Sequence, residues 1–165
     1  TASEHGTINP MGTVTVNYSA SQTFDMTPGT GYHIVDVLVD GNSVGALTSY
    51  TFDNVQSNHT IDVSFAINTY TLTAEAIGAG TITPSGTDTV NYGATVSYAI
   101  TPLTTSYHID SVVVDGINQG VIENYTFDAV SDDHAIRAYF SINLYTITAS
   151  VSGNGTITPA GTIVI

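Results

Sequence analysis

Apolar and polar residues alternate with a two-residue period in several short segments of the chain. The clearest are IDVSFAIN at 61–68, YTLTAE at 70–75 and YTITAS at 145–150. This period is typical of β-strands with one buried and one solvent-exposed face. No window of ten residues shows the 3.6-residue period of an amphipathic helix. The pattern therefore predicts an all-β protein.

Further strands are predicted between turn signals. Glycine, proline and Asp-Gly pairs at 40–41 and 115–116 punctuate the chain, and Asp-Gly between apolar runs is a hairpin signal. The segments between these signals are rich in Val, Thr, Tyr and Phe, which favour strands. We expect strands at 13–17, 22–27, 33–39 and 50–55, and at their counterparts in the second half of the chain.

The chain repeats itself. GTINPMGTVTVNYS at 6–19 returns as GTITPSGTDTVNYG at 80–93, and GTITPAGTIVI closes the sequence at 155–165. Two later phrases, YHI followed by VDG and then YTFD, also occur twice, and about half of the aligned residues are identical. The offset is 74 residues and then, after one insertion, 75. A fixed period of this size indicates tandem structural repeats.

The period predicts two small antiparallel β modules of about 75 residues, sandwich-like or β-grasp-like without a long helix, followed by a strand fragment of a third. The predicted domains are 1–69, which lacks its first strand, 70–144, and the opening strands of a third repeat at 145–165. A core this small depends on neighbouring modules for stability. The aromatic residues expected in it are Tyr50, Phe52, Phe65, Tyr125, Phe127 and Phe140.

Charge narrows the function classes. The chain has fourteen acidic residues, one Arg and no Lys, for a net charge of −13. Such a surface repels phosphate groups, so we expect no nucleic-acid partner. There is no Cys, which excludes disulfides and thiolate chemistry. No apolar run reaches the ~20 residues of a membrane helix, so membrane insertion is not expected.

The repeated phrases resemble a known family. GTITPSGTDTVNYGATVSYAITP, YHIDSVVVDG, YTFDAV and AIRAYFSIN are similar to the divergent internalin B-type repeat, over two copies and a fragment. The second copy departs from the pattern with Ser106-Tyr107 where Gly31-Tyr32 stands in the first. The resemblance implies an extracellular or cell-surface β-rich spacer or adhesive module. It implies no catalytic residues.

No catalytic motif in the sequence has the structural context that it requires. Gly41-Asn-Ser-Val-Gly45 matches the nucleophile-elbow pattern, but that elbow joins a strand to a helix, and here an Asp-Gly hairpin signal is followed by a strand-like run. The histidines recur in pairs, at 33 and 108 and at 59 and 134, without metal-ligand spacing. We expect them to make structural hydrogen bonds at strand ends. The sequence predicts that the protein is not an enzyme.

Two kinds of ligand stay open. Many acidic residues without cations leave Ca²⁺ as a possible cofactor, although no calcium-loop motif appears and solvated acids or hairpin turns explain the positions better. Four sequons place possible glycosylation at Asn17, Asn58, Asn124 and Asn154, with Asn58 favoured because it lies in a predicted loop. No other cofactor is expected.

The sequence predicts a structural role. The opening strand that the first repeat lacks has an equivalent in the tail, so we expect head-to-tail pairing with copies of the chain or with neighbouring repeats in an extracellular filament or surface stalk. Residues 150–165 duplicate 1–16, so a window of a longer array is the competing interpretation. The alternative function is an adhesin or carbohydrate-binding accessory module with a glycan partner. The candidate inter-subunit strand is Tyr145, Thr146, Ile147, Thr148 and Ala149.

Overall fold

The regular secondary structure of the described residues is all β, as predicted. The computed structural model describes residues 5–165, which contain no helix. The strands are β1 (Gly6–Asn9), β2 (Gln22–Pro28), β3 (Tyr32–Val39), β4 (Asn42–Ser43), β5 (Ser49–Phe52), β6 (Ile61–Ile67), β7 (Thr69–Ile77), β8 (Gly80–Thr83), β9 (Gly86–Asn91), β10 (Val96–Pro102), β11 (Tyr107–Val114), β12 (Ile117–Asn118), β13 (Asn124–Phe127), β14 (His134–Ile142), β15 (Thr146–Ala149) and β16 (Gly161–Val164).

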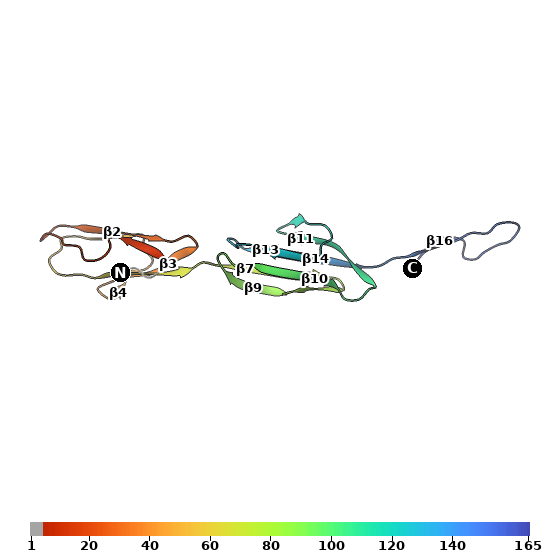
Figure 1. Ribbon diagram of the computed structural model, residues 1–165, viewed down its shortest axis with the longest axis horizontal. Helices are drawn as coiled ribbons and strands as arrows, with labels where there is room; N and C mark the ends of the chain where they lie inside the picture. Colours follow the sequence, from red (N-terminus) through yellow and green to blue (C-terminus); the bar gives the residue numbers. More distant parts are fainter. Residues whose placement is uncertain (1–4) are drawn as a thin grey trace. The chain divides into compact units, whose positions relative to one another are not determined.

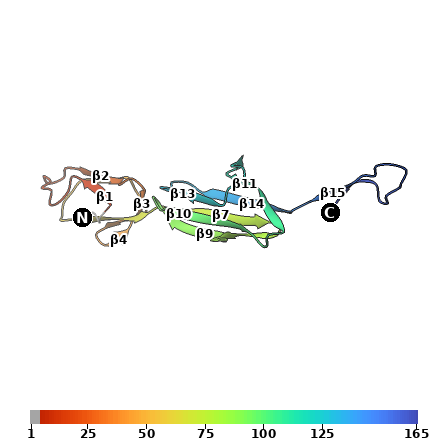
Figure 2. The ribbon, with the colours of Figure 1, turned by 45° about the vertical axis from the view of Figure 1, so that its right-hand side comes forward.

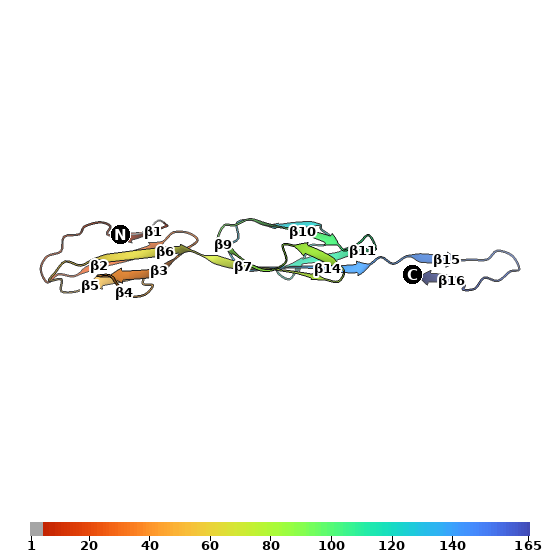
Figure 3. The ribbon, with the colours of Figure 1, turned by 90° about the horizontal axis from the view of Figure 1, so that it is seen from below.

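The first repeat forms two small antiparallel sheets, ordered β1-β2-β5 and β4-β3-β6. Figure 3 shows β6 running beside β3. Every second residue of β2 and β6 turns inward because the side-chain period of a strand is two. The buried cluster between the sheets consists of Ile8, Phe24, Met26, Ile34, Val37 and Val63.

The second repeat has the same plan with two additional strands. One sheet is ordered β13-β10-β8, and the other is ordered β12-β11-β14-β7-β9. Strand β7 lies between β14 and β9, and it runs parallel to β14 while the other pairs are antiparallel (Figures 1 and 2). Leu72 and Ala74 of β7 are buried, at 1% and 5% exposure. Strand β7 is therefore part of the core of this repeat.

The tail forms a separate hairpin. Strand β15 pairs antiparallel with β16, with Ile147 opposite Ile163 (Figure 3). Two main-chain hydrogen bonds of 2.9 Å between Tyr145 and Ile165 extend this pairing. The hairpin corresponds to the β7–β9 pair of the second repeat.

The chain divides into two compact units whose limits differ from those of the repeats. The first unit holds the chain up to Tyr70 together with Thr89–Thr95 and Asp128–Asp133. The second holds Thr71–Asp88, Val96–Phe127 and His134–Ile165. Two loops of the second repeat thus belong to the first unit. The predicted boundaries at 69 and 144 follow the sequence period and stay a prediction.

Several strand predictions need correction. Residues 13–17 form no strand, although their counterparts lie in β9, which lies beside β7 in the sheet of the second repeat. The strand expected at 50–55 ends at Phe52. The Gly-Thr-Ile phrases at 6–8 and 80–82, where no strand was predicted, form β1 and β8, each followed by a cis X–Pro bond. The Asp-Gly hairpins are confirmed: Asp40 and Gly41 both have positive φ and connect β3 to β4.

The predicted core aromatics are only partly buried. Phe127 and Phe140 are buried and Tyr125 is half-buried, whereas Tyr50, Phe52 and Phe65 of the first repeat are all half-buried. This difference between the repeats falls on the side where β7 lies in the second repeat.

Candidate functional site

The beginning of the closing strand is arranged differently in the two repeats. Within the described residues the sheet of the first repeat is ordered β4-β3-β6, whereas β14, the counterpart of β6, lies between β11 and β7. His134 of β14 is paired with Leu72 of β7, but the corresponding His59 stands before the start of β6.

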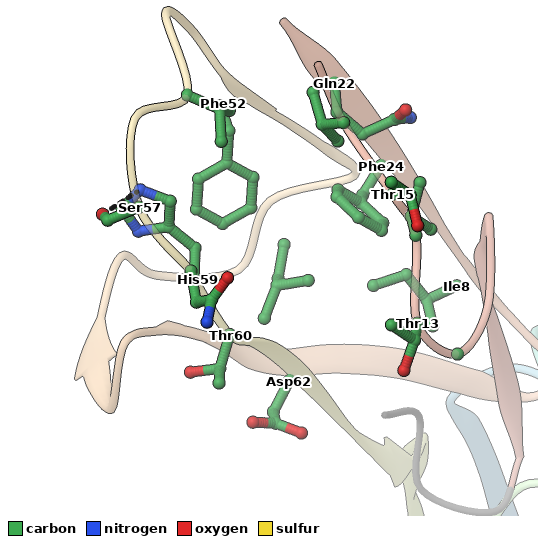
Figure 4. A pocket seen from close by; sticks show the side chains of 16 residues that line it. Ile8, Thr13, Thr15, Gln22, Phe24, Phe52, Ser57, His59, Thr60 and Asp62 are labelled. Atoms are coloured by element: carbon green, nitrogen blue, oxygen red, sulfur yellow. Dashed lines mark hydrogen bonds between the residues drawn. The ribbon is translucent and has the colours of Figure 1, made fainter. Parts of the chain in front are cut away.

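A groove of about 680 Å³ occupies this position. Figure 4 shows Ile8 and Phe24 on one wall and Phe52 and His59 on the other. Its rim carries hydroxyl and carboxylate groups, including those of Thr13 and Asp62. The groove combines an apolar floor with a polar margin, which suits an amphipathic strand.

Burial at matched positions shows what the groove leaves uncovered. Phe127 is 6% exposed and Ile136 is 0% exposed in the second repeat. Their counterparts Phe52 and Ile61 are only partly buried. In the second repeat Leu72 and Ala74 of β7, which are paired with His134 and Ile136, are also buried.

A histidine–carboxylate pair fixes one wall of the groove. The ring of His59 stacks on Phe52, with centroids 5.0 Å apart, and its Nδ1 lies 2.7 Å from an Asp40 carboxylate oxygen. The other Asp40 oxygen accepts the Thr60 N–H at 2.8 Å. The His59 hydrogen bond first, and then the Thr60 N–H, lower the pKa of the Asp40 carboxyl below its ordinary value.

The same arrangement recurs in the second repeat. His134 stacks on Phe127 with centroids 4.6 Å apart, and its Nδ1 lies 2.7 Å from Asp115. The other histidine pair, at 33 and 108, forms hydrogen bonds of 2.8 Å to Asn68 and Asn143. The structural hydrogen bonds expected for the four paired histidines are therefore present.

A tyrosine joint lies within the first unit. The Tyr92 N–H donates to the Asn68 carbonyl at 2.8 Å, and the Asn68 N–H donates to the Gly31 carbonyl at 2.8 Å. Gly31 has φ of +77°, and a Cβ there would overlap the ring of Tyr92. The ring also lies 6.5 Å from that of Tyr70. Glycine is thus required at position 31 both by its backbone and by the close approach of Tyr92.

Tyr18 is the counterpart of Tyr92, and its ring is uncovered. Its side chain is 78% exposed. The loop around it is nevertheless built in the same way: Ala20 N–H donates to Asn17 and Ser19 N–H donates to Val55, as Ala94 does to Asn91 and Gly93 to Val130. Tyr18 is therefore presented on a formed loop rather than on an unstructured one.

The second unit contains the counterpart of the surface on which Tyr92 rests. A hollow of about 410 Å³ is lined by Thr105, Ser106, Ile142, Asn143, Tyr145 and Ile165. Asn143 donates its N–H to the Ser106 carbonyl at 2.8 Å, as Asn68 does to Gly31. This bend is one residue longer than that of the first repeat, and Ser106 stands where the first repeat has Gly31 with its positive φ. The main-chain hydrogen bond is kept, but the residue on which a tyrosine ring would pack differs.

The predicted inter-subunit strand is formed and accessible. Thr146–Ala149 is β15, and Tyr145 precedes it. Tyr145 is 65% exposed and Ile147 is 54% exposed, whereas Leu72 at the position of Ile147 is buried. The tail strand thus has the same type of apolar residue as β7 at this position, but the side chain is exposed instead of packed in a core.

The four sequon asparagines are exposed. Asn58 lies outside the strands, as expected, and lines the groove. Asn17 lies in the Tyr18 loop, Asn124 begins β13, and Asn154 lies between β15 and β16. Glycosylation at these positions stays a prediction.

The other motifs fall into turns. Ser43 of the Gly41–Gly45 phrase donates to Asp36 at 2.7 Å, inside a hairpin that no helix follows. Within residues 5–165, no group of three or more acidic or histidine side chains is placed to hold a metal ion. Calcium binding stays a prediction.

Sequence reasoning missed the tyrosine joint and the residues of the groove. The signal available was the recurrence of Val-Asn-Tyr at 16–18 and 90–92, which indicates a constant loop but not what the tyrosine contacts. The groove residues Val14 and Phe52 were expected only as members of a strand and of the core, and no strand was expected at Ile8.

Comparisons with protein-family models, with curated proteins and with solved structures found no match. Within the described residues there is also no helix of the length and apolarity needed to cross a membrane.

Proposed function

We propose that the protein is a structural repeat segment of an extracellular filament or surface stalk, in which successive repeats are joined head-to-tail. The observation that carries this proposal is the tyrosine joint. A loop of the second repeat belongs to the same compact unit as the first repeat and is fastened there by Tyr92, Asn68 and Gly31. A contact of this kind between successive repeats is what a repeat array requires.

Two further observations support the proposal. The half of the joint that would face a preceding repeat is present as the exposed Tyr18 loop, and the half that would face a following repeat is present as the hollow at Ser106 and Asn143. A contact between different surfaces of identical units does not close on itself and generates a linear assembly. The resemblance to internalin B-type repeats adds the extracellular setting.

Negative-stain electron microscopy of the purified chain at neutral pH tests the proposal. We expect filaments whose length increases with protein concentration and whose axial repeat equals one chain. Tyr18→Ala should shorten them, while Tyr125→Phe, a change at a half-buried residue of β13, should leave them unchanged. Single particles at every concentration would contradict the proposal.

The alternative, an adhesin or carbohydrate-binding module, has a separate readout. A glycan array probed with the same chain distinguishes the two functions because inter-repeat packing requires no sugar. Reproducible micromolar binding to one glycan class, together with no filaments, would favour the alternative.

A further inference from the structure

We propose that Ser57, His59 and Asp40 form an acyl-transfer site at the edge of the groove, which hydrolyses carboxylic esters that have a short apolar acyl group. Figure 4 shows Ser57 beside the ring of His59, and the Ser57 Oγ lies 3.4 Å from the His59 Nε2. The His59 Nδ1 lies 2.7 Å from an Asp40 carboxylate oxygen. A hydroxyl, an imidazole and a carboxylate in this order are the groups that activate a serine nucleophile. This activity goes beyond the structural role and departs from the expectation that the protein is not an enzyme.

The hydrogen bonds fix the form of His59 that the reaction needs. The Asp40 carboxylate accepts from Nδ1, so the neutral ring carries its proton there and presents the lone pair of Nε2 to Ser57. The second Asp40 oxygen accepts the Thr60 N–H at 2.8 Å, and the ring of His59 stacks on Phe52. Because the His59 hydrogen bond, followed by the Thr60 N–H, lowers the pKa of Asp40, this carboxyl is ionised at neutral pH. His59 is therefore held in the orientation of a general base.

The second repeat separates the structural part of this arrangement from the part that we assign to chemistry. His134 lies 2.7 Å from Asp115, which also accepts the Ala135 N–H at 2.8 Å. The residue two positions before His134 is Asp132, where the first repeat has Ser57. The histidine–carboxylate pair is thus common to both repeats, and the hydroxyl beside the histidine is particular to the first. The 3.4 Å contact is long for a hydrogen bond, as catalytic contacts often are before substrate binds.

The groove supplies the remaining parts of the site. Ser57 and His59 line it together with the apolar side chains of Phe24 and Phe52. An apolar floor suits an acyl chain, and the net charge of −13 disfavours anionic substrates. Asn58 also lines the groove. Its side-chain amide is the group that we assign as hydrogen-bond donor to the oxyanion that develops on the ester carbonyl.

The reaction has two balanced steps. In the first, the Ser57 oxygen bonds to the ester carbonyl carbon while its proton moves to the His59 Nε2, and the alcohol leaves with that proton. In the second, water gives a proton to His59 and its oxygen attacks the acyl-serine, the bond to Ser57 breaks, and Ser57 regains the proton as the carboxylic acid is released. Asp40 stabilises the imidazolium that forms in each step. Water is the only co-reactant.

Hydrolysis of p-nitrophenyl butyrate by the purified chain at neutral pH tests the site. We expect Ser57→Ala and His59→Gln each to lower kcat/KM at least tenfold. Ser57 is exposed, so its replacement should leave the fold intact. The matched controls are Ser131→Ala, at an exposed serine near His134, and His134→Gln, which removes the equivalent histidine of the second repeat; both should leave the rate unchanged. Equal rates for the natural chain and Ser57→Ala would overturn the proposal.

Covalent labelling identifies the nucleophile. A fluorophosphonate reagent forms an oxygen–phosphorus bond to an activated serine as fluoride leaves, and mass spectrometry should locate this adduct on Ser57 in the natural chain and find none in His59→Gln. An adduct spread evenly over the hydroxyl side chains of the protein would overturn the proposal. Hydrolysis lost in His59→Gln but kept in Ser57→Ala would show that His59 activates water directly, and would overturn Ser57 as the nucleophile. Ser57→Ala should still form filaments, so this inference and the proposed function fail independently.

Discussion

Single residues hold the repeats in shape through local contacts between polar and aromatic groups. The repeated Phe–His–Asp arrangement connects the hairpin after β3 to the beginning of the closing strand. In the first repeat it forms a wall of the groove. The ionisation of the Asp40 carboxyl is therefore relevant to the stability of the first repeat.

We expect Asp40→Asn to destabilise the chain more at pH 6 than at pH 2.5. The folded-state pKa of Asp40 is lowered below 3.8 by the His59 hydrogen bond and the Thr60 N–H. A lowered folded pKa stabilises the protein above the unfolded value, and this contribution disappears as pH falls through the folded value. Urea midpoints at the two pH values measure it. Asp132→Asn controls for the loss of one negative charge, and an Asp40→Asn effect that is equal at both pH values would contradict the expectation.

Gly31→Ala should cost more stability in the natural chain than in a Tyr92→Ala background. A positive φ strains alanine in both chains by about 1–2 kcal/mol, but the overlap with the aromatic ring exists only where Tyr92 is present. Urea denaturation of the four chains in a double-mutant cycle isolates this interaction. Gly45→Ala, at a positive φ with nothing near the added Cβ, is the matched control for strain alone. Additive effects of the two substitutions would show that Tyr92 does not pack on position 31.

At the level of elements, sequence alternation predicted strands well wherever one face is buried. Segments such as β6 and β14 show it because their inward positions contribute to a core. Residues 13–17 alternate equally well yet form no strand, since alternation records which face would be buried and not whether a neighbouring strand is there to pair with. Strand β1 was missed for another reason: it begins at Gly6 and is followed by Pro10, and both residue types are depleted in strands.

The site was less predictable than the fold. The candidate inter-subunit strand could be proposed from the sequence because Tyr-Thr-Ile-Thr-Ala repeats an earlier phrase, Tyr-Thr-Leu-Thr-Ala, that has an alternating pattern. The tyrosine joint could not, because a single aromatic residue in a loop has no periodicity and its contact spans from position 92 to position 31. Long-range contacts of this kind depend on the packing of the whole unit.

Ile163→Asp should loosen the tail hairpin. Strand β15 is paired with β16, and Ile163 lies opposite Ile147. A carboxylate at position 163 removes this apolar cross-strand pair, worth about 0.2–1 kcal/mol. We expect faster amide hydrogen exchange in residues 146–149 and unchanged exchange in β3. Unchanged exchange in 146–149 would show that this pair does not stabilise the hairpin.

At the scale of the whole molecule, the proposed head-to-tail joint has two halves, one in each unit. The Tyr18 loop lies in the first unit, and the hollow lined by Ser106, Asn143 and Tyr145 lies in the second. A contact between two different surfaces of identical chains extends into a linear assembly only while each chain keeps both surfaces. Removing either surface should therefore limit assembly.

Tyr18→Ala and Tyr145→Ala chains should each assemble less than the natural chain, whereas a mixture of the two should form pairs. The Tyr145→Ala chain keeps the Tyr18 loop and the Tyr18→Ala chain keeps the hollow, so one joint can form between them and cannot be continued. Sedimentation velocity at equal total protein concentration measures the size distribution. Tyr125→Phe, at a half-buried residue of β13, is the control and should assemble as the natural chain does. Long filaments from either alanine variant alone would show that the repeats join by another contact.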